Sequence, residues 1–396
     1  MKEFKVALIG VGGRGQDLYR ASMSKIENLC FVAVCDSSQE NGEKTAKEME
    51  ENGRKRPAIY QDYKKCIDET MPDVVVIATS WETHLEISMY AMEKGIAVAC
   101  EVAGAYNLDG LWNLVRCYER TKTPIMLMEN CCYGQMELLA LEMKRQGLLG
   151  KIVHCEGGYH HDLRQEMTTR PQHYRIYEYI HRNSENYPTH EIGPIAKLLD
   201  INCGNRFVSL VSVGSSAHGL KEYVEKENIE WLKGVDYQQS DIVTTILKCA
   251  NGETVTITLD TTLPRYYSRG LMVQGTKGLI CEENRSVFLE TEAAGDHWNW
   301  KDNFNNIDGY YEKYNHKLWK DYRPGQGGHG GMDYLTFKAF FDALEKGEPM
   351  PIDVYDMATW MAITALSEQS LATGQAVAFP DFTGGKWTRA KSNFAL

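Results

Sequence analysis

A glycine-rich turn near the N-terminus constrains the fold of this chain more than any other feature. Gly10–Gly15, with the sequence GVGGRG, follows a short apolar run over residues 4–9 and precedes a helical pattern over residues 16–28. A second apolar run, residues 31–35, ends at Asp36, which lies 21 positions after the last glycine of the turn. This succession of strand, turn, helix and strand is typical of a βαβ unit in a parallel sheet.

The spacing of the glycines predicts a nucleotide-binding turn. Gly10, Gly12 and Gly15 match the pattern that lets the backbone approach a pyrophosphate at the start of a helix. Asp36 stands where an acidic side chain accepts hydrogen bonds from the hydroxyls of an adenosine ribose. Because the same carboxylate would repel a 2′-phosphate, the sequence predicts NAD rather than NADP. A doubly wound sheet that binds no nucleotide is the alternative.

Three further apolar runs continue the pattern, over residues 73–78, 96–100 and 124–128, with helix-like segments between them. Their hydrophobicity is continuous rather than alternating, which fits strands that are covered on both faces of a sheet. We therefore expect an α/β fold over residues 1–128, a Rossmann domain with a doubly wound parallel sheet.

Longer strand patterns follow after residue 150, over residues 151–161, 207–215, 241–249, 254–262 and 270–281. Asn251-Gly252 predicts a two-residue hairpin turn between two of these strands. We expect residues 129–396 to form an α+β substrate-binding domain with a large open, mainly antiparallel sheet and helices on one face. The segment 291–328, rich in Trp, Tyr, Asn and Gly, is expected to be a long ordered loop over a site or at an oligomer contact.

Composition excludes several classes of function. With 43 basic and 54 acidic residues the formal net charge is −11, which argues against general affinity for nucleic acid or an anionic membrane surface. No apolar run reaches the roughly 20 residues that span a bilayer. The 11 cysteines show no C-x-x-C spacing, so we expect a reduced chain with no metal site. The first strand begins too early for a cleavable export signal, which predicts a cytoplasmic protein.

Polar residues follow several predicted strands of the first domain. Trp81, Glu82, Thr83 and His84 follow the third of its long apolar runs, and Glu101-Val102 follows the next. Ligands bind at the carboxyl ends of strands in such sheets. Packing at a helix start is the alternative for the tryptophan and the histidine. Asn130 belongs to the same edge and is a candidate partner for nicotinamide.

The second domain carries three polar clusters. The segment Tyr187–His190, with the sequence YPTH, precedes a helix expected from about Ile192, and a histidine there has the near-neutral pKa suited to a general base. Read alone, a histidine is more often structural. The other clusters are residues 159–162 and 264–269; strand alternation puts Tyr159 and His161 on one face.

A glycine-rich segment, residues 327–333 with the sequence GGHGGMD, stands apart from these clusters. Close approach of the backbone to a ligand is one reason for so many glycines. A flexible hinge or a turn at a helix start explains them equally well, and the sequence leaves the three readings open.

These motifs resemble those of a known group of enzymes. The chain is similar to the superfamily of glucose-fructose oxidoreductase, inositol dehydrogenase and rhizopine catabolism proteins, and within it to glycoside hydrolase family 109, the NAD-dependent α-N-acetylgalactosaminidases. The resemblance covers nearly the whole chain through residues 12–15, 101–102, 128–130, 187–190, 264–269, 328–333 and 380–382. The superfamily's dehydrogenases keep a lysine at the position of Val102. Family 109 lacks that lysine, so Val102 favours the narrower assignment.

The resemblance implies a glycosidase that uses NAD catalytically. In the family, NAD oxidises C3 of the sugar, a base removes the C2 proton, the glycosidic oxygen leaves C1, water adds and hydride returns. The net reaction is hydrolysis without the usual two flanking carboxylates. The alternatives are an NAD-dependent sugar dehydrogenase that makes 3-keto glycosides, and a sugar or NADH sensor without activity.

The resemblance also implies roles for individual residues. NAD contacts fall on Gly10, Gly12, Arg14, Gly15, Asp36, Trp81, Glu82, Thr83, His84, Glu101, Val102, Asn130 and Tyr187. Sugar contacts fall on Tyr159, Arg175, Tyr187, Thr189, His190 and Tyr267. His190 is expected to transfer the proton, Tyr187 to act at C3 or hold the nicotinamide, and Tyr267 to orient a hydroxyl or the leaving group.

One departure from the family pattern lies beside these residues. Glu191 replaces a glycine that is common in the family, and a carboxylate there is expected to alter the sugar or linkage preference. The expected partners are a small carbohydrate or glycoside substrate and further copies of the chain, joined as a homo-oligomer through the antiparallel sheet.

Overall fold

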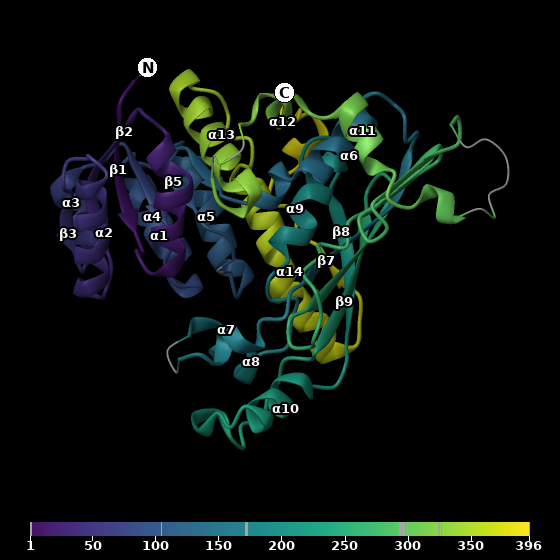
Figure 1. The fold of residues 1–396 in the computed structure, drawn as a ribbon, viewed down its shortest axis with the longest axis horizontal. Coiled ribbons are helices and arrows are strands. Elements are labelled where there is room, and N and C mark those ends of the chain that lie inside the picture. Colours follow the sequence, from purple (N-terminus) through teal and green to yellow (C-terminus); the bar gives the residue numbers. More distant parts are fainter. Residues whose placement is uncertain are drawn as a thin grey trace. The chain divides into compact units, whose positions relative to one another are not determined.

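The computed structural model describes residues 2–103, 105–170, 173–292, 298, 300–323, 325 and 327–395. It divides into two compact units, each assembled from separate stretches of chain (Figure 1). The first unit comprises Met1–Tyr133, Asp321–Ala358 and Asn393–Leu396, and the second comprises Gly134–Lys320 and Thr359–Ser392. The sequence did not indicate that a late segment returns to the first unit, and the expected domain change at residue 128 stays a prediction.

The first unit is built on a six-stranded parallel sheet in the order β3-β2-β1-β4-β5-β6. Its strands are β1 Phe4–Ile9, β2 Leu29–Cys35, β3 Ala58–Tyr60, β4 Val74–Ile77, β5 Ala97–Cys100 and β6 Ile125–Leu127. Every residue of β4 and β5 is buried, as expected for continuous apolar runs inside a covered sheet. The predicted doubly wound sheet is confirmed. Strand β3 was not predicted, because its three residues are partly exposed and carry little apolar signal.

Helices join these strands and return late in the chain. They are α1 Gly13–Ala21, α2 Gln39–Glu51, α3 Tyr63–Thr70, α4 His84–Glu93, α5 Leu108–Thr121 and α13 Met332–Lys346, with α14 Val354–Thr373 beginning here and ending in the second unit. The expected helix over residues 16–28 was wrong at both ends. It starts within the glycine turn and stops at Ala21, because Ser22 leaves helical geometry before a short 3-10 turn.

The second unit contains an eight-stranded sheet in the order β13-β12-β11-β7-β10-β9-β8-β14. Its strands are β7 Ile152–His160, β8 Phe207–Gly214, β9 Ile242–Cys249, β10 Thr254–Asp260, β11 Met272–Gly275, β12 Gly278–Cys281, β13 Ser286–Leu289 and β14 Val377–Ala378. Only β7 and β10 pair in parallel among the described strands of this sheet, so the mainly antiparallel prediction is confirmed.

Of two hairpins in this sheet, the sequence predicted one and missed the other. The predicted turn at Asn251-Gly252 joins β9 to β10, and Gly252 adopts a φ of 109° that favours glycine. The single strand expected over residues 270–281 was wrong. It is split into β11 and β12 by Thr276 and Lys277, whose backbone N–H groups bond to the chain just before β7.

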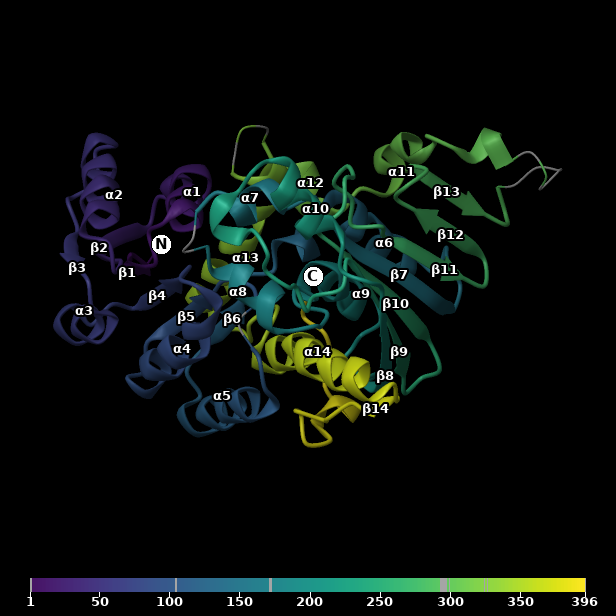
Figure 2. The same ribbon diagram turned by 90° about the horizontal axis from the view of Figure 1, so that it is seen from below.

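The helices of the second unit are α6 Gln135–Arg145, α7 Arg164–Thr168, α8 Tyr174–His181, α9 Thr189–Leu198, α10 Gly219–Lys226, α11 Ile307–Tyr314 and α12 Lys317–Asp321, the last ending at the first residue of the returning segment. Figure 2 shows α6 and α9 on one face of the sheet, and the opposite face exposes Val213 and Ile246. The oligomer contact expected on this sheet stays a prediction. Part of the expected loop over residues 291–328 lies outside the described residues, and α11 and α12 make the rest partly helical.

Two local features position the polar segment 187–190. Helix α9 begins at Thr189 rather than near Ile192, because Pro188 serves as its N-terminal cap residue. A Cβ at Gly157 of β7 would lie 3.0 Å from Ile195 and 3.1 Å from a backbone oxygen of α9, so glycine allows the helix to approach the strand closely.

No helix among the described residues is long and apolar enough to cross a lipid bilayer.

Candidate functional site

The predicted nucleotide turn of the first unit is tightly folded around two glycines. Gly10 has a φ of 88°, and a Cβ there would lie 2.5 Å from the backbone of Ala78 after β4. A Cβ at Gly15 would overlap the carbonyl oxygen of Gly10. These two glycines therefore let helix α1 start directly against the ends of the strands.

The rest of the turn leaves room for an anion. A Cβ at Gly12 or at Gly13 would meet nothing within 4 Å, and no side chain caps the start of α1. The N–H groups of the first helical turn can therefore donate to a phosphate. Asp36, at the end of β2, accepts hydrogen bonds from the backbone N–H of Val11 and of Ser38, each at 2.9 Å. This open, uncapped turn beside a carboxylate fits a dinucleotide.

The loop after β4 holds four of the predicted cofactor residues. Trp81 is buried, and Glu82 is exposed and accepts a hydrogen bond from Ser80 at 2.7 Å. His84 is buried, with Nδ1 2.9 Å from the carbonyl oxygen of Ala103 and Nε2 3.0 Å from that of Thr79. Burial lowers the pKa of the His84 imidazole. The His84 ring thus holds the loop in place, which is the packing role that the sequence left open as an alternative. Direct contact of the four residues with NAD stays a prediction.

Glu101 and Val102 follow β5 and have different surroundings. Glu101 Oε1 accepts hydrogen bonds from Nε and Nη2 of Arg14 at 3.1 and 2.9 Å. Val102 is a buried apolar side chain, so this position offers no group that can move a proton.

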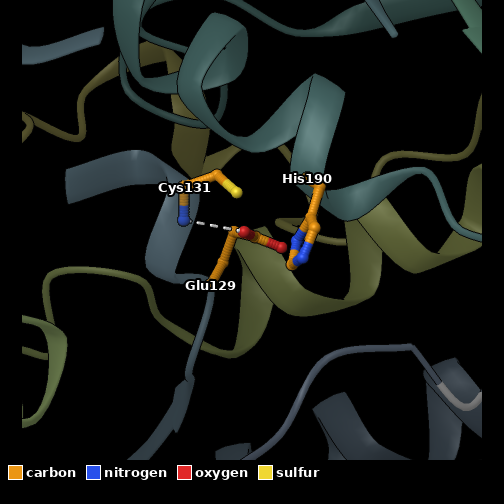
Figure 3. A group of neighbouring side chains, drawn as sticks. All are labelled: Glu129, Cys131 and His190. Carbon is orange, nitrogen blue, oxygen red and sulfur yellow. Dashed lines mark hydrogen bonds between the residues drawn. The ribbon is translucent and has the colours of Figure 1, made fainter. Parts of the chain in front are cut away.

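Just beyond β6, the backbone N–H of Cys131 donates to Glu129 Oε1 at 3.0 Å, as Figure 3 shows.

The first unit also contains a site residue that the sequence did not single out. Asp333, at the start of α13, accepts hydrogen bonds from Arg14 at 2.9 and 3.0 Å and from Asn130 at 2.7 Å. Two predicted cofactor residues therefore meet on one carboxylate. The sequence signals near it were the glycines of residues 327–331 and the family resemblance over residues 328–333, neither of which gave Asp333 a role.

In the second unit, three aromatic rings gather where β7 meets the start of α9. The ring centres of Tyr159 and Tyr187 are 4.5 Å apart, and that of His190 lies 5.5 and 4.8 Å from them, nearly perpendicular to both. Figure 3 shows the imidazole of His190 projecting from the first turn of its helix. The predicted sugar residues on β7 and on the YPTH segment therefore form one cluster.

Three further side chains surround these rings. The guanidinium carbon of Arg175, on α8, lies 4.7 Å from the Tyr187 ring centre. The Tyr159 hydroxyl is 3.3 Å from His161 Nδ1, and the His161 ring centre is 5.1 Å from that of Tyr267. The predicted shared face of Tyr159 and His161 is thus confirmed. Tyr267 is 47% exposed.

Burial dominates the electrostatics of this cluster. It raises the pKa of Tyr159 to about 12, although the Arg175 charge acts in the opposite direction. Burial also lowers the pKa of His161. His160, on the other strand face, packs against Gly158 and Gly270, and burial lowers its pKa to about 4. The tyrosine and the two histidines are therefore neutral near pH 7.

Comparison with known proteins identifies the family. The model of the oxidoreductase family with an NAD-binding Rossmann fold matches residues 4–128, and the model of the C-terminal domain of glycosyl hydrolase 109 matches residues 133–389. The chain belongs to glycosyl hydrolase family 109. The predicted resemblance, the predicted class of enzyme and NAD as the cofactor are confirmed.

Relatives of this family 109 chain match along almost its full length. An alpha-N-acetylgalactosaminidase of Tannerella forsythia is 37% identical, with 99% of this chain and 89% of the relative covered. A glycosyl hydrolase family 109 protein of Stenotrophomonas maltophilia is 38% identical, with 100% and 92% covered. Among solved structures, levoglucosan dehydrogenase with NADH and levoglucosan superposes with a TM-score of 0.72 at 20% identity, covering 96% of this chain and 100% of that one. At that identity the solved structure shows the fold alone.

The family 109 chain carries a buried pair of carboxyl groups at either end of its YPTH segment. Glu185 and Glu191 are 0% and 2% exposed and face each other, and Glu191 Oε2 accepts a hydrogen bond from the Thr258 backbone at 3.1 Å. Burial raises the pKa of both carboxyl groups, and for Glu191 the neighbouring Glu185 adds to the effect. The pair therefore retains a proton at neutral pH. Glu191, which follows His190 directly in sequence, is thus a buried neutral group.

Thr189 completes the predicted sugar residues. Its side chain is fully buried at the first position of α9. The structure therefore brings Tyr159, Arg175, Tyr187 and His190 together. Tyr267 is linked to them through His161, and the side chain of Thr189 is buried.

Proposed function

We propose that this chain hydrolyses α-N-acetylgalactosaminides or related glycosides, with NAD retained and restored in every turnover. Bound NAD supplies a temporary oxidation of the sugar at C3 and the matching reduction at the end. The observation that carries the proposal is the cluster of Tyr159, Tyr187 and His190. The proposal is also supported by the buried apolar Val102 after β5, at the position where the dehydrogenases of the superfamily keep a lysine. Two relatives named alpha-N-acetylgalactosaminidase support this choice of sugar.

The cluster has the groups that a proton transfer at C2 needs. A ketone at C3 acidifies the neighbouring C2–H, so a base of modest strength suffices to remove the proton. His190 projects from the first turn of α9 and is the one member of the three rings that is not fully buried. We assign removal and return of the C2 proton to its imidazole.

The remaining residues bind and orient the sugar. The Tyr159 hydroxyl is neutral and donates or accepts a hydrogen bond, and the flat faces of the two tyrosines suit the C–H surface of a pyranose. Arg175 places a positive charge beside Tyr187, where it stabilises negative charge that develops on an enolate. Tyr267, which is 47% exposed, is assigned to the leaving group.

The test is aglycone release from aryl α- and β-N-acetylgalactosaminides and galactosides by the protein as purified, with no NAD added. We expect release without accumulation of NADH. Stoichiometric NADH with no aglycone would instead identify the dehydrogenase alternative. Binding of sugar with neither product, unchanged in His190→Ala, would identify a sensor.

A further inference from the structure

Asp333 has a carboxylate whose hydrogen-bonding capacity is filled inside the first unit. The residue is 2% exposed, and its two oxygens receive four contacts. Arg14 donates through Nη1 to Oδ2 at 2.9 Å and through Nη2 to Oδ1 at 3.0 Å. Asn130 Nδ2 donates to Oδ1 at 2.7 Å, and His329 Nδ1 lies 2.8 Å from Oδ2. A carboxylate accepts about four hydrogen bonds, so none of its capacity remains for other groups.

The partners of this carboxylate come from separate strand ends. Arg14 belongs to the glycine turn after β1, and Asn130 follows β6 at the sheet edge. Arg14 also binds Glu101, which follows β5. One side chain from a helix more than 200 residues later in sequence therefore fixes two groups at the carboxyl edge of the sheet. That edge is where ligands of such sheets bind.

The glycine-rich segment 327–331 brings Asp333 to this place. A Cβ at Gly328 would lie 2.7 Å from Asp333 Oδ2, and a Cβ at Gly331 would lie 2.5 Å from the Tyr322 ring. Gly331 has a φ of 110°, which side chains rarely adopt. Of the roles that the sequence left open, the segment therefore serves as a helix-entry turn that clears space for the carboxylate.

Burying the charged groups around Asp333 costs more desolvation free energy than apolar packing at the same place would. Burial acts to raise the pKa of Asp333, but the hydrogen bonds from His329 and Arg14 outweigh it and hold the pKa below its ordinary range. The carboxylate is therefore ionised, and a buried ion pair is on average no more stabilising than an apolar contact of the same shape. What the ion pair adds is direction: a bidentate contact fixes the plane of the Arg14 guanidinium.

We propose that Asp333 is a positioning residue for NAD, which holds Arg14 and Asn130 in the orientation that retains the cofactor through turnover. This inference rests on the proposed function, because it uses the assignment of these two residues to NAD and the need to keep NAD bound. Asp333 itself acts through its partners, since its oxygens are fully engaged.

His329 gives a milder way to disturb the same carboxylate. Because an ionised Oδ2 only accepts, the hydrogen at 2.8 Å lies on His329 Nδ1, and the 3.2 Å approach of Arg14 to that nitrogen is a contact without a shared hydrogen. The side chain of His329 is 55% exposed. Because so much of the side chain lies outside the core, we expect His329→Ala to fold like the wild type while it removes one donor to Asp333.

The experiment measures how fast NAD bound to the purified holoprotein exchanges with isotopically labelled NAD. Asp333→Asn keeps the shape but removes the charge, and we expect exchange to be about 10- to 100-fold faster, as for loss of charge-assisted hydrogen bonds. His329→Ala is expected to speed exchange roughly threefold. Asp342→Asn changes a partly exposed aspartate on the same helix that pairs with Lys338; it is the matched control and should exchange like the wild type.

A second readout separates positioning from general stability. With NAD at saturation, Asp333→Asn should keep the wild-type KM for the aryl glycoside, because no sugar residue is disturbed. Unchanged NAD exchange in Asp333→Asn overturns the inference. If that variant fails to fold, unchanged exchange in His329→Ala overturns it and faster exchange supports it.

The outcome is independent of glycosidase activity. If the wild type cleaves no glycoside and the Asp333→Asn variant exchanges NAD faster than the wild type, the proposed function is overturned and this inference is supported. Glycoside cleavage by the wild type together with normal NAD exchange in Asp333→Asn would do the reverse.

Discussion

The guanidinium carbon of Arg175 lies 4.7 Å from the centre of the Tyr187 ring. Arg175 is buried, so this cation–π contact is poorly screened by water and fixes both side chains. Lysine cannot reproduce the planar stacking of a guanidinium. We expect Arg175→Lys to lower kcat/KM for an aryl glycoside by about tenfold.

The control for this substitution is Arg116→Lys. Arg116 also lies near an aromatic ring, that of Trp112, but it is exposed on α5. Steady-state kinetics should show no change for Arg116→Lys. Equal effects of the two substitutions would mean that the contact at Tyr187 has no special part in the reaction.

His190→Gln tests proton transfer in the aromatic cluster. Glutamine keeps a polar side chain of similar length but has no titratable nitrogen, so kcat should fall by about 10²- to 10⁴-fold. Single-turnover aglycone release measures the loss. His154→Gln, on β7 and bonded to Thr254, is the matched control and should retain wild-type kcat. A His190→Gln enzyme with normal kcat would exclude this imidazole as the base.

Two glycines of the nucleotide turn should respond differently to alanine. A Cβ at Gly15 would overlap the Gly10 carbonyl, so Gly15→Ala is expected to destabilise the first unit by roughly 2 kcal/mol or more and to lose NAD. A Cβ at Gly12 meets no protein atom within 4 Å, so Gly12→Ala should keep the wild-type unfolding midpoint. The added methyl group would lie where the backbone approaches the pyrophosphate, so the affinity for NAD should fall about tenfold. Thermal unfolding and NAD titration distinguish the two. Equal NAD affinity in Gly12→Ala and wild type would show that the turn does not approach the cofactor.

The buried pair of Glu185 and Glu191 predicts a pH dependence of stability. Both carboxyl groups have a raised pKa in the folded chain, so the folded state binds protons more tightly than the unfolded state. Stability is highest below the unfolded glutamate pKa of about 4.3 and falls as the pH rises towards the raised values. Glu191→Gln removes this loss, and the free energy of unfolding at pH 8 should increase by on the order of 1 to 3 kcal/mol.

Denaturant unfolding at pH 5 and pH 8 measures that difference. The gain of Glu191→Gln over wild type should be large at pH 8 and small at pH 5. Glu222→Gln, at an exposed position of α10, is the control and should show the wild-type pH profile. Parallel profiles for Glu191→Gln and wild type would contradict the buried proton.

Local sequence patterns predicted most of the sheet architecture. Continuous apolar runs marked β1, β2, β4, β5 and β6, because each strand is covered on both faces. The turn between β11 and β12 was missed because its backbone bonds go to residues 149 and 151, far away in sequence. Short β3 carried too few apolar residues to be recognised.

The candidate site was predictable where a motif is local, and the family resemblance added separate residues such as Arg175 and Tyr267. The glycine turn and the YPTH segment are continuous, so their residues could be named from the sequence. The pairing of Asp333 with Arg14 could not be predicted, because it spans 319 residues and depends on the return of α13 to the first unit. The pairing of Glu185 with Glu191 likewise depends on how the chain turns at Pro188 before α9.

The most direct test of the central claim follows hydrogen at C2 of the sugar. The purified protein is incubated with an aryl α-N-acetylgalactosaminide in D₂O without added NAD, and the released sugar is analysed by NMR. Transient oxidation at C3 with proton transfer by His190 predicts deuterium at C2 of the product and hydrogen retained at C3. Aglycone release with ordinary hydrogen at C2 would contradict the account.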